Sequence, residues 1–263
     1  MTQSRPGADP ILEIEGLHKS YGGLRAVAGA SFSVRRGSLT ALIGPNGAGK
    51  TTLFDLVTGF TGPDRGAIRF ESRTIAGLPP HRIARRGLVR TFQLTRVLAA
   101  MTVLENMMLA PPGQPGESLL CMLQPGSGSR RAEAMQRERA LALLGHFNLR
   151  EKADDYAGLL SGGQRKLLEL ARALMVGPRL VLLDEPMAGV NRVLGGKLLD
   201  YVEELRRTGG VTFLFVEHDM DVVMTRADHV VVMAEGAVIA EGSPEAVRAD
   251  PRVIDADLGR AAT

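Results

Sequence analysis

One glycine-rich segment of the chain has residue types that suit phosphate binding. It reads Gly44-Pro45-Asn46-Gly47-Ala48-Gly49-Lys50-Thr51 and matches the pattern G-x-x-x-x-G-K-[ST] at every fixed position. Glycines let the backbone wrap closely round an anion, so that N–H groups can donate to phosphate oxygens. Lys50 adds a cation for the β- and γ-phosphates, and the Thr51 hydroxyl can bind Mg²⁺. We therefore predict a nucleotide phosphate site that also includes Thr52. The alternative is a glycine-rich turn that only opens a helix.

An acidic pair forms a second candidate site. Asp184 and Glu185 directly follow the apolar run Leu180–Leu183, which is expected to be a buried strand. Chemistry in a parallel sheet gathers at the carboxyl ends of the strands. Asp184 is expected to hold Mg²⁺ against the nucleotide that Lys50 binds, and Glu185 to polarise an attacking water. The alternative is a pair of solvated carboxylates at a strand end.

A histidine occupies a comparable position after another strand. His218 follows the apolar run Val211–Val216. It can donate a hydrogen bond to a γ-phosphate near neutral pH. The alternative is a loop histidine that faces solvent.

The elements around these residues alternate between strands and helices. The run Ser38–Ile43 is expected to be a strand that leads into the glycine-rich segment, and Thr51–Val57 the start of a helix. Apolar residues recur at helical spacing from Leu167 to Leu174, and a further helix is expected at Leu198–Arg207. Strands that alternate with helices predict an α/β fold with a mainly parallel sheet covered on both faces.

Other short apolar runs predict additional strands. Ile11–Ile14 and Ala30–Val34 are expected to be strands with a turn at Arg36-Gly37 between them, and Ala67–Phe70 another strand. These runs indicate an N-terminal, antiparallel β subdomain. Near the other end, Val230–Met233 and Ala237–Ala240 flank Glu235-Gly236, which predicts a hairpin.

The remaining segments are expected to be helical. Residues 94–158 form a predicted helical subdomain inserted between the core segments 11–93 and 159–242, and residues 243–263 a helical tail. The basic stretch 130–139 contains Glu133 and Glu138 and no aromatic residues, so we interpret it as a solvated helix face and expect no nucleic-acid partner.

Composition limits the class of protein. The chain has 263 residues, of which 44% are hydrophobic and 23% charged, with a net charge of +3; this is typical of a soluble globular protein. Cys121 is the single cysteine, so no intrachain disulfide can form and a reducing cytosol is expected. Met1–Pro10 lacks the apolar core of a signal peptide, and no apolar run approaches the length of a membrane span.

One further segment resembles a family motif. Leu160-Ser161-Gly162-Gly163-Gln164-Arg165-Lys166 resembles the signature motif of ATP-binding-cassette (ABC) ATPases, and it precedes Asp184-Glu185 as in that family. Tyr21 lies where the family stacks an aromatic residue on adenine, and Gln93 where it has the lid loop that senses Mg²⁺ and water. Ala188–Asn191 resembles the loop that crosses to the partner subunit, and His218 resembles the switch histidine. The resemblance extends from Ile11 to about Gly242.

The resemblance implies a function and a set of partners. It implies a P-loop NTPase core that binds ATP and Mg²⁺, in a dimer of identical or paralogous chains that encloses two ATP molecules. The implied catalytic residues are Glu185, His218 and Gln93. The implied metal-binding residues are Thr51, Gln93 and Asp184. The nucleotide would also contact Ser161, Gly162, Gly163 and Gln164 of the opposite chain. Separate permease subunits would carry the membrane spans, which places the chain on the inner face of the cell membrane.

Four motifs narrow the resemblance to one subfamily. Arg90–Gln93, Met101–Asn106, Glu217–Met220 and Asp257–Gly259 resemble ATPase subunits of bacterial importers for branched-chain amino acids, and are similar to those for urea and other amides. Asn191 stands where many ABC ATPases have Asp, a substitution common in this subfamily. A substrate-binding protein would deliver the amino acid to the permease.

Two readings outside transport remain open. Soluble ABC ATPases act in DNA repair or on ribosomes, but they usually carry two cassettes or a long coiled coil, and this chain has no sustained heptads. A nucleotide sensor without hydrolysis is opposed by the presence of Glu185 and His218.

The lid flank adds an expectation about the permease. The apolar residues around the lid loop exceed what one lid needs, so an exposed patch for a permease helix is expected there. They are Leu94, Val97, Leu98 and Met101. The alternative for each single residue is that it packs under the lid as ordinary core.

Overall fold

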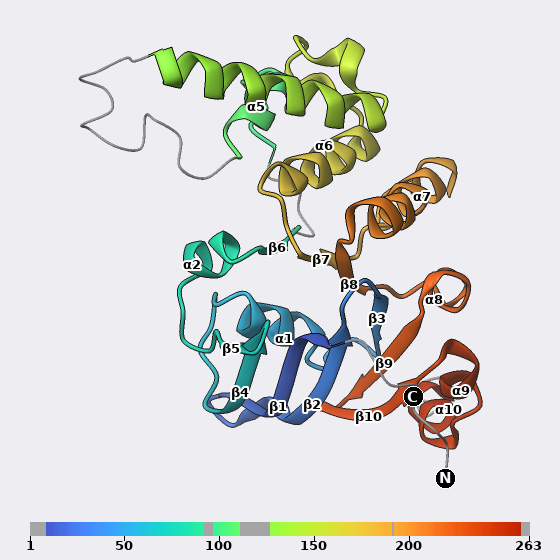
Figure 1. Ribbon diagram of the computed structural model, residues 1–263. Coiled ribbons are helices and arrows are strands. Elements are labelled where there is room, and N and C mark those ends of the chain that lie inside the picture. Colours follow the sequence, from blue (N-terminus) through green and yellow to red (C-terminus); the bar gives the residue numbers. More distant parts are fainter. Residues whose placement is uncertain (1–8, 92–96, 111–126, 191, 259–263) are drawn as a thin grey trace. The chain divides into compact units, whose positions relative to one another are not determined.

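A computed structural model of the chain describes residues 9–91, 97–110, 127–190 and 192–258 (Figure 1). These residues form two compact units, each assembled from separate stretches of sequence. The first unit contains Met1–Arg90, Arg179–Pro186 and Val202–Thr263. The second unit contains Thr91–Pro178 and Met187–Tyr201. The second unit is larger than the predicted helical segment 94–158, since it also includes the signature motif.

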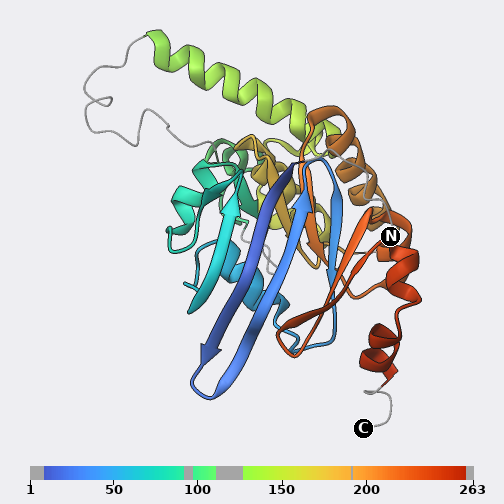
Figure 2. The same cartoon turned by 60° about the horizontal axis from the view of Figure 1, so that its bottom comes forward.

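The first unit contains an antiparallel sheet of four strands in the order β2-β1-β4-β5. Its long strands β1 and β2 lie side by side in Figure 2 and are joined by a tight turn at Gly22 and Gly23. The prediction that Arg36-Gly37 joins the first two strands is wrong, because that turn leads from β2 into β3. A glycine pair fits the first turn better, because Gly22 has a positive φ of 58°. The strands are β1 (Pro10–Tyr21), β2 (Leu24–Arg35), β4 (Arg65–Phe70) and β5 (Arg73–Thr74).

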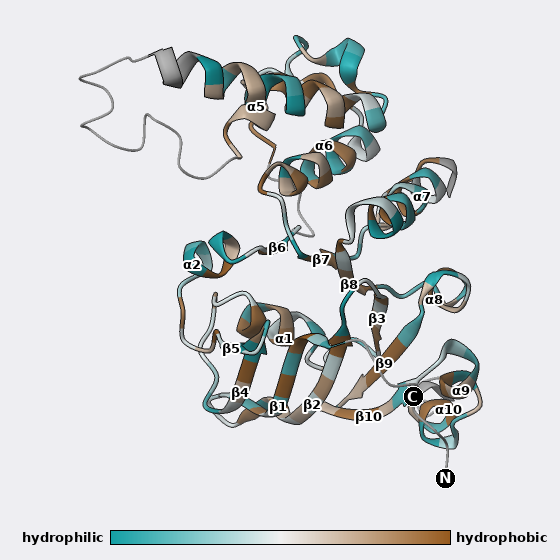
Figure 3. Ribbon diagram, in the orientation of Figure 1, coloured by the Kyte–Doolittle hydropathy of each residue, from teal (hydrophilic) through white to brown (hydrophobic). Residues whose placement is uncertain are grey.

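A second sheet of six strands carries the site, in the order β10-β9-β3-β8-β7-β6. All neighbours are parallel except β9 and β10, which form the hairpin predicted around Glu235-Gly236. Three central strands are buried at every residue, which explains why their sequences are mostly apolar (Figure 3). The strands are β3 (Leu39–Ile43), β6 (Leu88–Arg90), β7 (Leu180–Asp184), β8 (Thr212–Val216), β9 (His229–Ala234) and β10 (Ala237–Gly242).

One buried cluster joins both sheets of the first unit to the helix after the glycine-rich segment. Phe54 of that helix packs in the same cluster as Ile14 of β1, Phe70 of β4 and Leu182 of β7. Full burial of one such side chain contributes about 1.5–3 kcal/mol. The helices of this unit are α1 (Lys50–Val57), α2 (Pro80–Arg85), α8 (Met220–Arg226), α9 (Pro244–Arg248) and α10 (Pro251–Leu258).

The second unit is helical in its described residues. Thr102 and Glu105 form a reciprocal capping box at the start of α3, a device in which two side chains satisfy backbone N–H groups at a helix start. Asn106 is fully buried in the same helix. The elements are α3 (Val103–Met108), α5 (Ser127–His146), the short segments η2 (Arg150–Lys152) and η3 (Ala157–Leu159), α6 (Gly162–Met175), and the first part of α7 (Arg192–Gly209).

The predicted fold class is thereby confirmed: an α/β core, an antiparallel β layer and a helical segment. None of the helices in these described stretches combines the length and apolarity needed to cross a bilayer.

The glycine-rich segment is packed against backbone from distant parts of the first unit. The Gly236 N–H donates to the Ala48 carbonyl at 3.1 Å, and the Gly236 carbonyl accepts from the Ala28 N–H at 2.8 Å. A Cβ on Gly44, which has a φ of 142°, would overlap the Met233 carbonyl oxygen. The β9–β10 hairpin therefore fixes both the path and the side-chain size of this segment.

This packing predicts unequal effects for two glycine substitutions. Gly47 has a φ of 81°, but no atom lies within 4 Å of an added Cβ. Gly47→Ala should therefore lower the free energy of unfolding only by the cost of a left-handed backbone at alanine, about 1–2 kcal/mol. Gly44→Ala adds an overlap with backbone and should cost on the order of 3–5 kcal/mol. Thermal unfolding of the nucleotide-free protein, followed by circular dichroism, measures both. Equal midpoints for the two variants would contradict this account of the segment.

Candidate functional site

The phosphate loop, defined here as residues 44–51, closes on its own lysine. The Lys50 Nζ donates to the Gly44 carbonyl at 2.6 Å and to the Pro45 carbonyl at 2.9 Å, and the residue is only 6% exposed. A buried ammonium must have hydrogen-bond acceptors, and here the loop carbonyls supply them. The cation is thus held at the start of α1, where the helix dipole also favours an anion.

Backbone donors surround this cation. The N–H groups of Gly47, Gly49, Thr51 and Thr52 donate to no acceptor within the part of the chain that the structure describes. Such groups at a helix N-terminus form an anion site. The loop therefore has the donor set that a nucleotide phosphate requires, and the prediction of a turn that only opens a helix explains neither the lysine nor these donors.

The acidic pair and the histidine meet at neighbouring strand ends. Strands β7 and β8 are paired in parallel up to Asp184 and Val216, so their carboxyl ends lie side by side. The Glu185 N–H donates to the Val216 carbonyl at 3.1 Å, and the Glu185 Oε1 lies 2.8 Å from the His218 Nε2. Because an ionised carboxylate only accepts, the imidazole donates through Nε2 when Glu185 is charged. The side chains of Asp184, Glu185 and His218 therefore follow neighbouring strand ends at one edge of the sheet.

Glu185 has an unusual backbone conformation. Its φ is +48°, a region that residues other than glycine rarely adopt. Its side chain is only 20% exposed and points to the histidine instead of open solvent. Strained backbone of this kind is retained where the surrounding structure fixes it, and it is common at functional sites.

Asp184 is buried and bonded to an arginine. Its Oδ2 accepts from the Arg90 Nη2 at 2.6 Å, and both side chains are almost completely buried. In the sequence, Arg90 is recognisable only as part of a subfamily motif, without a role of its own. An arginine at the end of the short strand β6, next to the strand that bears Asp184, could not be recognised before the strand order was known.

The oxygen donors in this region suit a hard divalent cation. A threonine hydroxyl and a carboxylate are ligands of the type that Mg²⁺ prefers, and magnesium usually keeps several waters and substrate phosphates besides one or two protein groups. Thr51 is exposed at the start of α1. The Asp184 Oδ1 accepts no hydrogen bond from any residue within the described ranges. Of the side chains expected to hold Mg²⁺, Thr51 and Asp184 therefore carry ligand atoms of the right kind.

Tyr21 ends strand β1 as a partly exposed ring. It is 49% exposed and is not part of the core. The Lys19 Nζ lies 5.5 Å from the ring centroid and is itself bonded to Asp64 at 2.9 Å. That ammonium, with the Ser20 N–H, holds the pKa of the Asp64 carboxyl below its usual value. A fixed, half-exposed aromatic ring suits base stacking.

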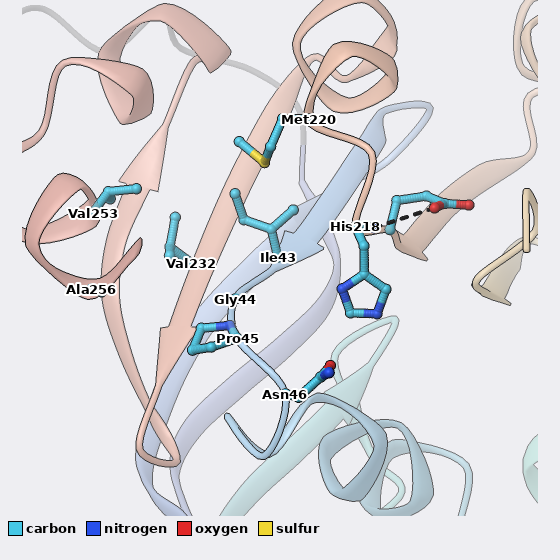
Figure 4. A pocket seen from close by; sticks show the side chains of 10 residues that line it. Ile43, Gly44, Pro45, Asn46, His218, Met220, Val232, Val253 and Ala256 are labelled. Atoms are coloured by element: carbon cyan, nitrogen blue, oxygen red, sulfur yellow. Dashed lines mark hydrogen bonds between the residues drawn. The ribbon is translucent and has the colours of Figure 1, made fainter. Parts of the chain in front are cut away.

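A cavity of about 290 Å³ lies beside the first half of the phosphate loop (Figure 4). In Figure 4 the His218 ring and the Asn46 side chain lie at one side, and apolar side chains that include Val232 and Val253 at the other. Val253 belongs to α10, so the C-terminal tail contributes to the surroundings of the loop.

The signature motif begins a helix of the second unit. The Ser161 Oγ accepts from the Gln164 N–H at 3.3 Å, and the Gln164 Oε1 accepts from the Ser161 N–H at 3.0 Å. This capping box leaves the Gly162 and Gly163 N–H groups without an acceptor among the described residues. Gly163 lies against Leu194 of α7, where a side chain would require that leucine to move.

Two predicted residues cannot be placed. Gln93 and Asn191 lie outside the described residues. In the loop before Asn191, Ala188 and Gly189 are exposed and Val190 is partly buried. Of the predicted site residues, those of the first unit other than Tyr21 gather at the phosphate loop and the adjoining strand ends. Ser161–Gln164 belong to the second unit.

Comparison with known proteins gives a consistent result. Residues 27–188 match the family model described as ABC transporter, and residues 237–263 match the model described as branched-chain amino acid ATP-binding cassette transporter. The high-affinity branched-chain amino acid transport ATP-binding protein BraF of Pseudomonas aeruginosa is 44% identical over 96% of this chain and 99% of its own.

Solved structures agree with this result. A nucleotide-free ATP-binding cassette from an ABC transporter has a TM-score of 0.81 and 40% identity, covering 94% of this chain and 98% of its own. An ATP-binding cassette in its ADP conformation has a TM-score of 0.79 and 38% identity, covering 95% of this chain and 99% of its own.

The strand-end geometry predicts the effect of removing the Glu185 carboxylate. Glu185→Gln keeps the size of the side chain and loses the base, so ATP hydrolysis should fall by about 10²–10⁴-fold while ATP affinity stays within a few-fold. Glu235→Gln is a matched control, because Glu235 is another glutamate with a positive φ, of 50°, located in the hairpin turn. Phosphate release and ATP binding measure both variants. Normal turnover in Glu185→Gln would exclude the proposed role.

The exposed ring of Tyr21 predicts a selective loss of binding. Tyr21→Ala should weaken ATP and ADP equally, by roughly 1–3 kcal/mol, because stacking on a base does not involve the γ-phosphate. Tyr21→Phe keeps the ring and loses only the hydroxyl, which lies 3.5 Å from the Thr61 Oγ1, so it should bind almost as the native protein does. Calorimetric titration with both nucleotides tests this. Unchanged affinity in Tyr21→Ala would place the adenine elsewhere.

Proposed function

The chain belongs to the ABC transporter family, and from that premise we propose that it is the ATP-hydrolysing subunit of an importer for branched-chain amino acids. The observation that carries the proposal is the convergence at one sheet edge of the Lys50 loop, Asp184 and the Glu185–His218 pair. The C-terminal match at residues 237–263 and the transport function of the 44% identical relative BraF support the substrate class.

The geometry supports a division of catalytic roles. ATP enters the phosphate loop, and Lys50 exchanges its bonds to the Gly44 and Pro45 carbonyls for phosphate oxygens. Glu185 accepts a proton from the attacking water, and His218 orients that carboxylate through the 2.8 Å contact. The charge that builds on the transferred phosphoryl group is met by Lys50 and by backbone N–H groups that are already in place.

We further propose that Mg²⁺ is the metal cofactor. Thr51 and Asp184 would hold it with Gln93 of the lid loop, and Gln93 would also align the attacking water. When bound, the ion neutralises charge on the β- and γ-phosphates. The other proposed nucleotide contacts are the loop residues 44–52 and Tyr21.

The signature helix supports a dimer. Its N-terminus presents the Gly162 and Gly163 N–H groups and the Ser161 hydroxyl, at positions that are exposed or only partly buried. Such a terminus favours an anion, and the γ-phosphate held by the opposite chain is the anion that we propose, with Gln164 beside it. The second chain is an identical copy or a paralogous ATPase. ATP would then join two chains and ADP, without the γ-phosphate, would not.

A surface of the second unit supports a permease as a further partner. The segment 98–102 pairs with residues 156–158 through the Ala157 N–H to Met101 carbonyl bond at 2.9 Å and the Gly158 N–H to Ala99 carbonyl bond at 3.1 Å. These paired segments expose large apolar side chains. They are Leu98 (44% exposed), Tyr156 (58%) and Leu159 (78%). We call these three residues the apolar patch.

The loop that bears Leu98 is fixed from within. The buried Asn106 accepts from the Leu98 N–H at 2.9 Å and donates to the Leu98 carbonyl at 3.0 Å. Of the residues expected in an exposed group, Leu98 is exposed, Val97 and Met101 are partly buried, and Leu94 lies outside the described residues. A rigid loop with an exposed leucine suits a docking site for a permease helix.

The proposal includes the organisation and location of the subunit. The proposed nucleotide-binding core comprises residues 11–93 and 159–242, although residues 159–178 and 187–201 pack in the second unit; residues 94–158 are the proposed helical subdomain and 243–263 the tail. The subunit is cytoplasmic and binds to the inner face of the cell membrane through its permeases. A substrate-binding protein acts on the permeases from the other side.

Reconstitution tests this function. The chain, its partner ATPase and the permeases, reconstituted in proteoliposomes with the binding protein, should hydrolyse ATP faster when leucine, isoleucine or valine is supplied. Stimulation by urea or short amides instead would assign the related substrate class. If no permease binds the chain, the importer part of the proposal fails and only the ATPase activity remains supported.

The apolar patch predicts a loss of coupling without a loss of hydrolysis. Leu98→Asp should keep basal ATP hydrolysis within a few-fold and abolish its stimulation by substrate, because a charge in an apolar contact opposes docking. Met135→Asp is the matched control, since Met135 is 64% exposed on α5 of the same unit. If Leu98→Asp retains full stimulation, the patch is not the permease contact.

A further inference from the structure

Arg90 connects two elements of the first unit that carry the expected Mg²⁺ ligands. Its Nη1 donates to the Asp55 Oδ1 at 2.5 Å and its Nη2 to the Asp184 Oδ2 at 2.6 Å. Asp55 belongs to α1, and Asp184 ends β7. The arginine itself ends β6 and has a side chain only 6% exposed. One guanidinium therefore joins the helix of the phosphate loop to the strand of the acidic pair.

The position of Asp55 links this contact to the metal site. Asp55 follows Thr51 by four residues in α1, so the two side chains lie on one face of the helix, one turn apart. The Thr51 hydroxyl and the Asp184 carboxylate are the groups that would hold Mg²⁺. A bond from Arg90 to Asp55 and another to Asp184 thus fixes the separation between the two elements that bear those groups.

The chemistry of arginine suits this task. Its planar guanidinium presents donors in a rigid fork, whereas a lysine ammonium is a point charge on a flexible chain. The Arg90 guanidinium carbon also lies 5.4 Å from the centroid of the Phe54 ring, which restricts the fork further. Asp55 and Asp184 carry two negative charges against one positive charge, so the group as a whole still favours a cation.

The bonding of Asp184 shows which oxygen the arginine controls. Arg90 uses Oδ2, and within the described residues Oδ1 accepts no hydrogen bond. The carboxylate is therefore held by one oxygen while the other is available.

We propose that Arg90 is a positioning residue that sets the separation and orientation of the two Mg²⁺-binding elements, α1 and the end of β7. The inference rests on the proposed function, because it takes Thr51 and Asp184 as metal-binding residues. Arg90 does not contact the nucleotide in this role. It acts through the Asp184 carboxylate and through α1, so its removal should affect metal-dependent binding more than metal-free binding.

The test compares ATP binding with and without Mg²⁺, measured by calorimetry in the Glu185→Gln background, in which turnover is strongly reduced. Arg90→Lys keeps the charge and loses the fork. Its ATP affinity in EDTA should stay within about twofold of the parent, whereas the gain in affinity on adding Mg²⁺ should fall about tenfold, as for other residues that orient metal ligands. Asp55→Asn breaks the α1 arm alone, leaves the buried arginine in place and should reduce the same gain. The double variant should show no further loss.

Arg206→Lys is the matched control. Arg206 also bonds two carboxylates, Asp228 and Glu203, each at 2.6 Å, and lies at the end of α7. The Arg206→Lys variant should be less stable than the parent, but Mg²⁺ should raise its ATP affinity by the same factor.

The outcomes separate the inference from the function on which it rests. If the parent protein gains no ATP affinity from Mg²⁺, the proposed metal site is wrong. Arg90 has only a structural role if Mg²⁺ raises the ATP affinity of Arg90→Lys and Asp55→Asn as much as that of the parent. The same conclusion follows if Arg206→Lys also loses this increase in ATP affinity.

Discussion

The close approach of backbone to backbone at the phosphate loop is the constraint on which the rest of the first unit depends. The Gly44 backbone lies against the Met233 carbonyl, where no Cβ fits, and Gly236 bonds both Ala48 and Ala28. Strand β9, strand β2 and the loop are therefore fixed together by residues that are far apart in the sequence. Because these bonds use other backbone groups, the loop N–H groups that would face a phosphate have no acceptor among the described residues. The free energy of folding thus holds an anion site open before any anion is bound.

The charged groups of the site follow the same principle. Lys50 donates to loop carbonyls, Arg90 to two carboxylates, and Glu185 contacts His218. A buried charge without a partner would cost several kcal/mol, so each of these groups needs an acceptor or a donor in the nucleotide-free state. These partners also hold the side chains near the positions at which nucleotide would meet them.

The second unit, by contrast, presents groups that its described residues do not satisfy. The N-terminus of α6 exposes the Gly162 and Gly163 N–H groups, and the apolar patch exposes Leu98, Tyr156 and Leu159. Hydrogen bonds hold both features in place: a capping box fixes the start of α6, and the Asn106 side chain fixes the loop of Leu98. Firm local structure that leaves donors and apolar surface exposed is typical of a subunit that functions in an assembly.

The sequence by itself determined the strand-loop-helix unit at the phosphate loop, the three buried strands, the hairpin at Glu235-Gly236 and the amphipathic helix around Leu167–Leu174, because each depends on local patterns of a few residues. Sequence also placed Asp184, Glu185 and His218 at strand ends, since apolar runs end visibly. It misplaced the turn at Arg36-Gly37, because either that pair or Gly22-Gly23 can close a turn and only the pairing of β1 with β2 selects one. Only the tertiary structure decided the order of the strands, and with it the role of Arg90. The arginine acts through carboxylates 35 residues before it and 94 residues after it, and a contact across such separations is set by how β6, β7 and α1 pack, not by any periodicity along the chain.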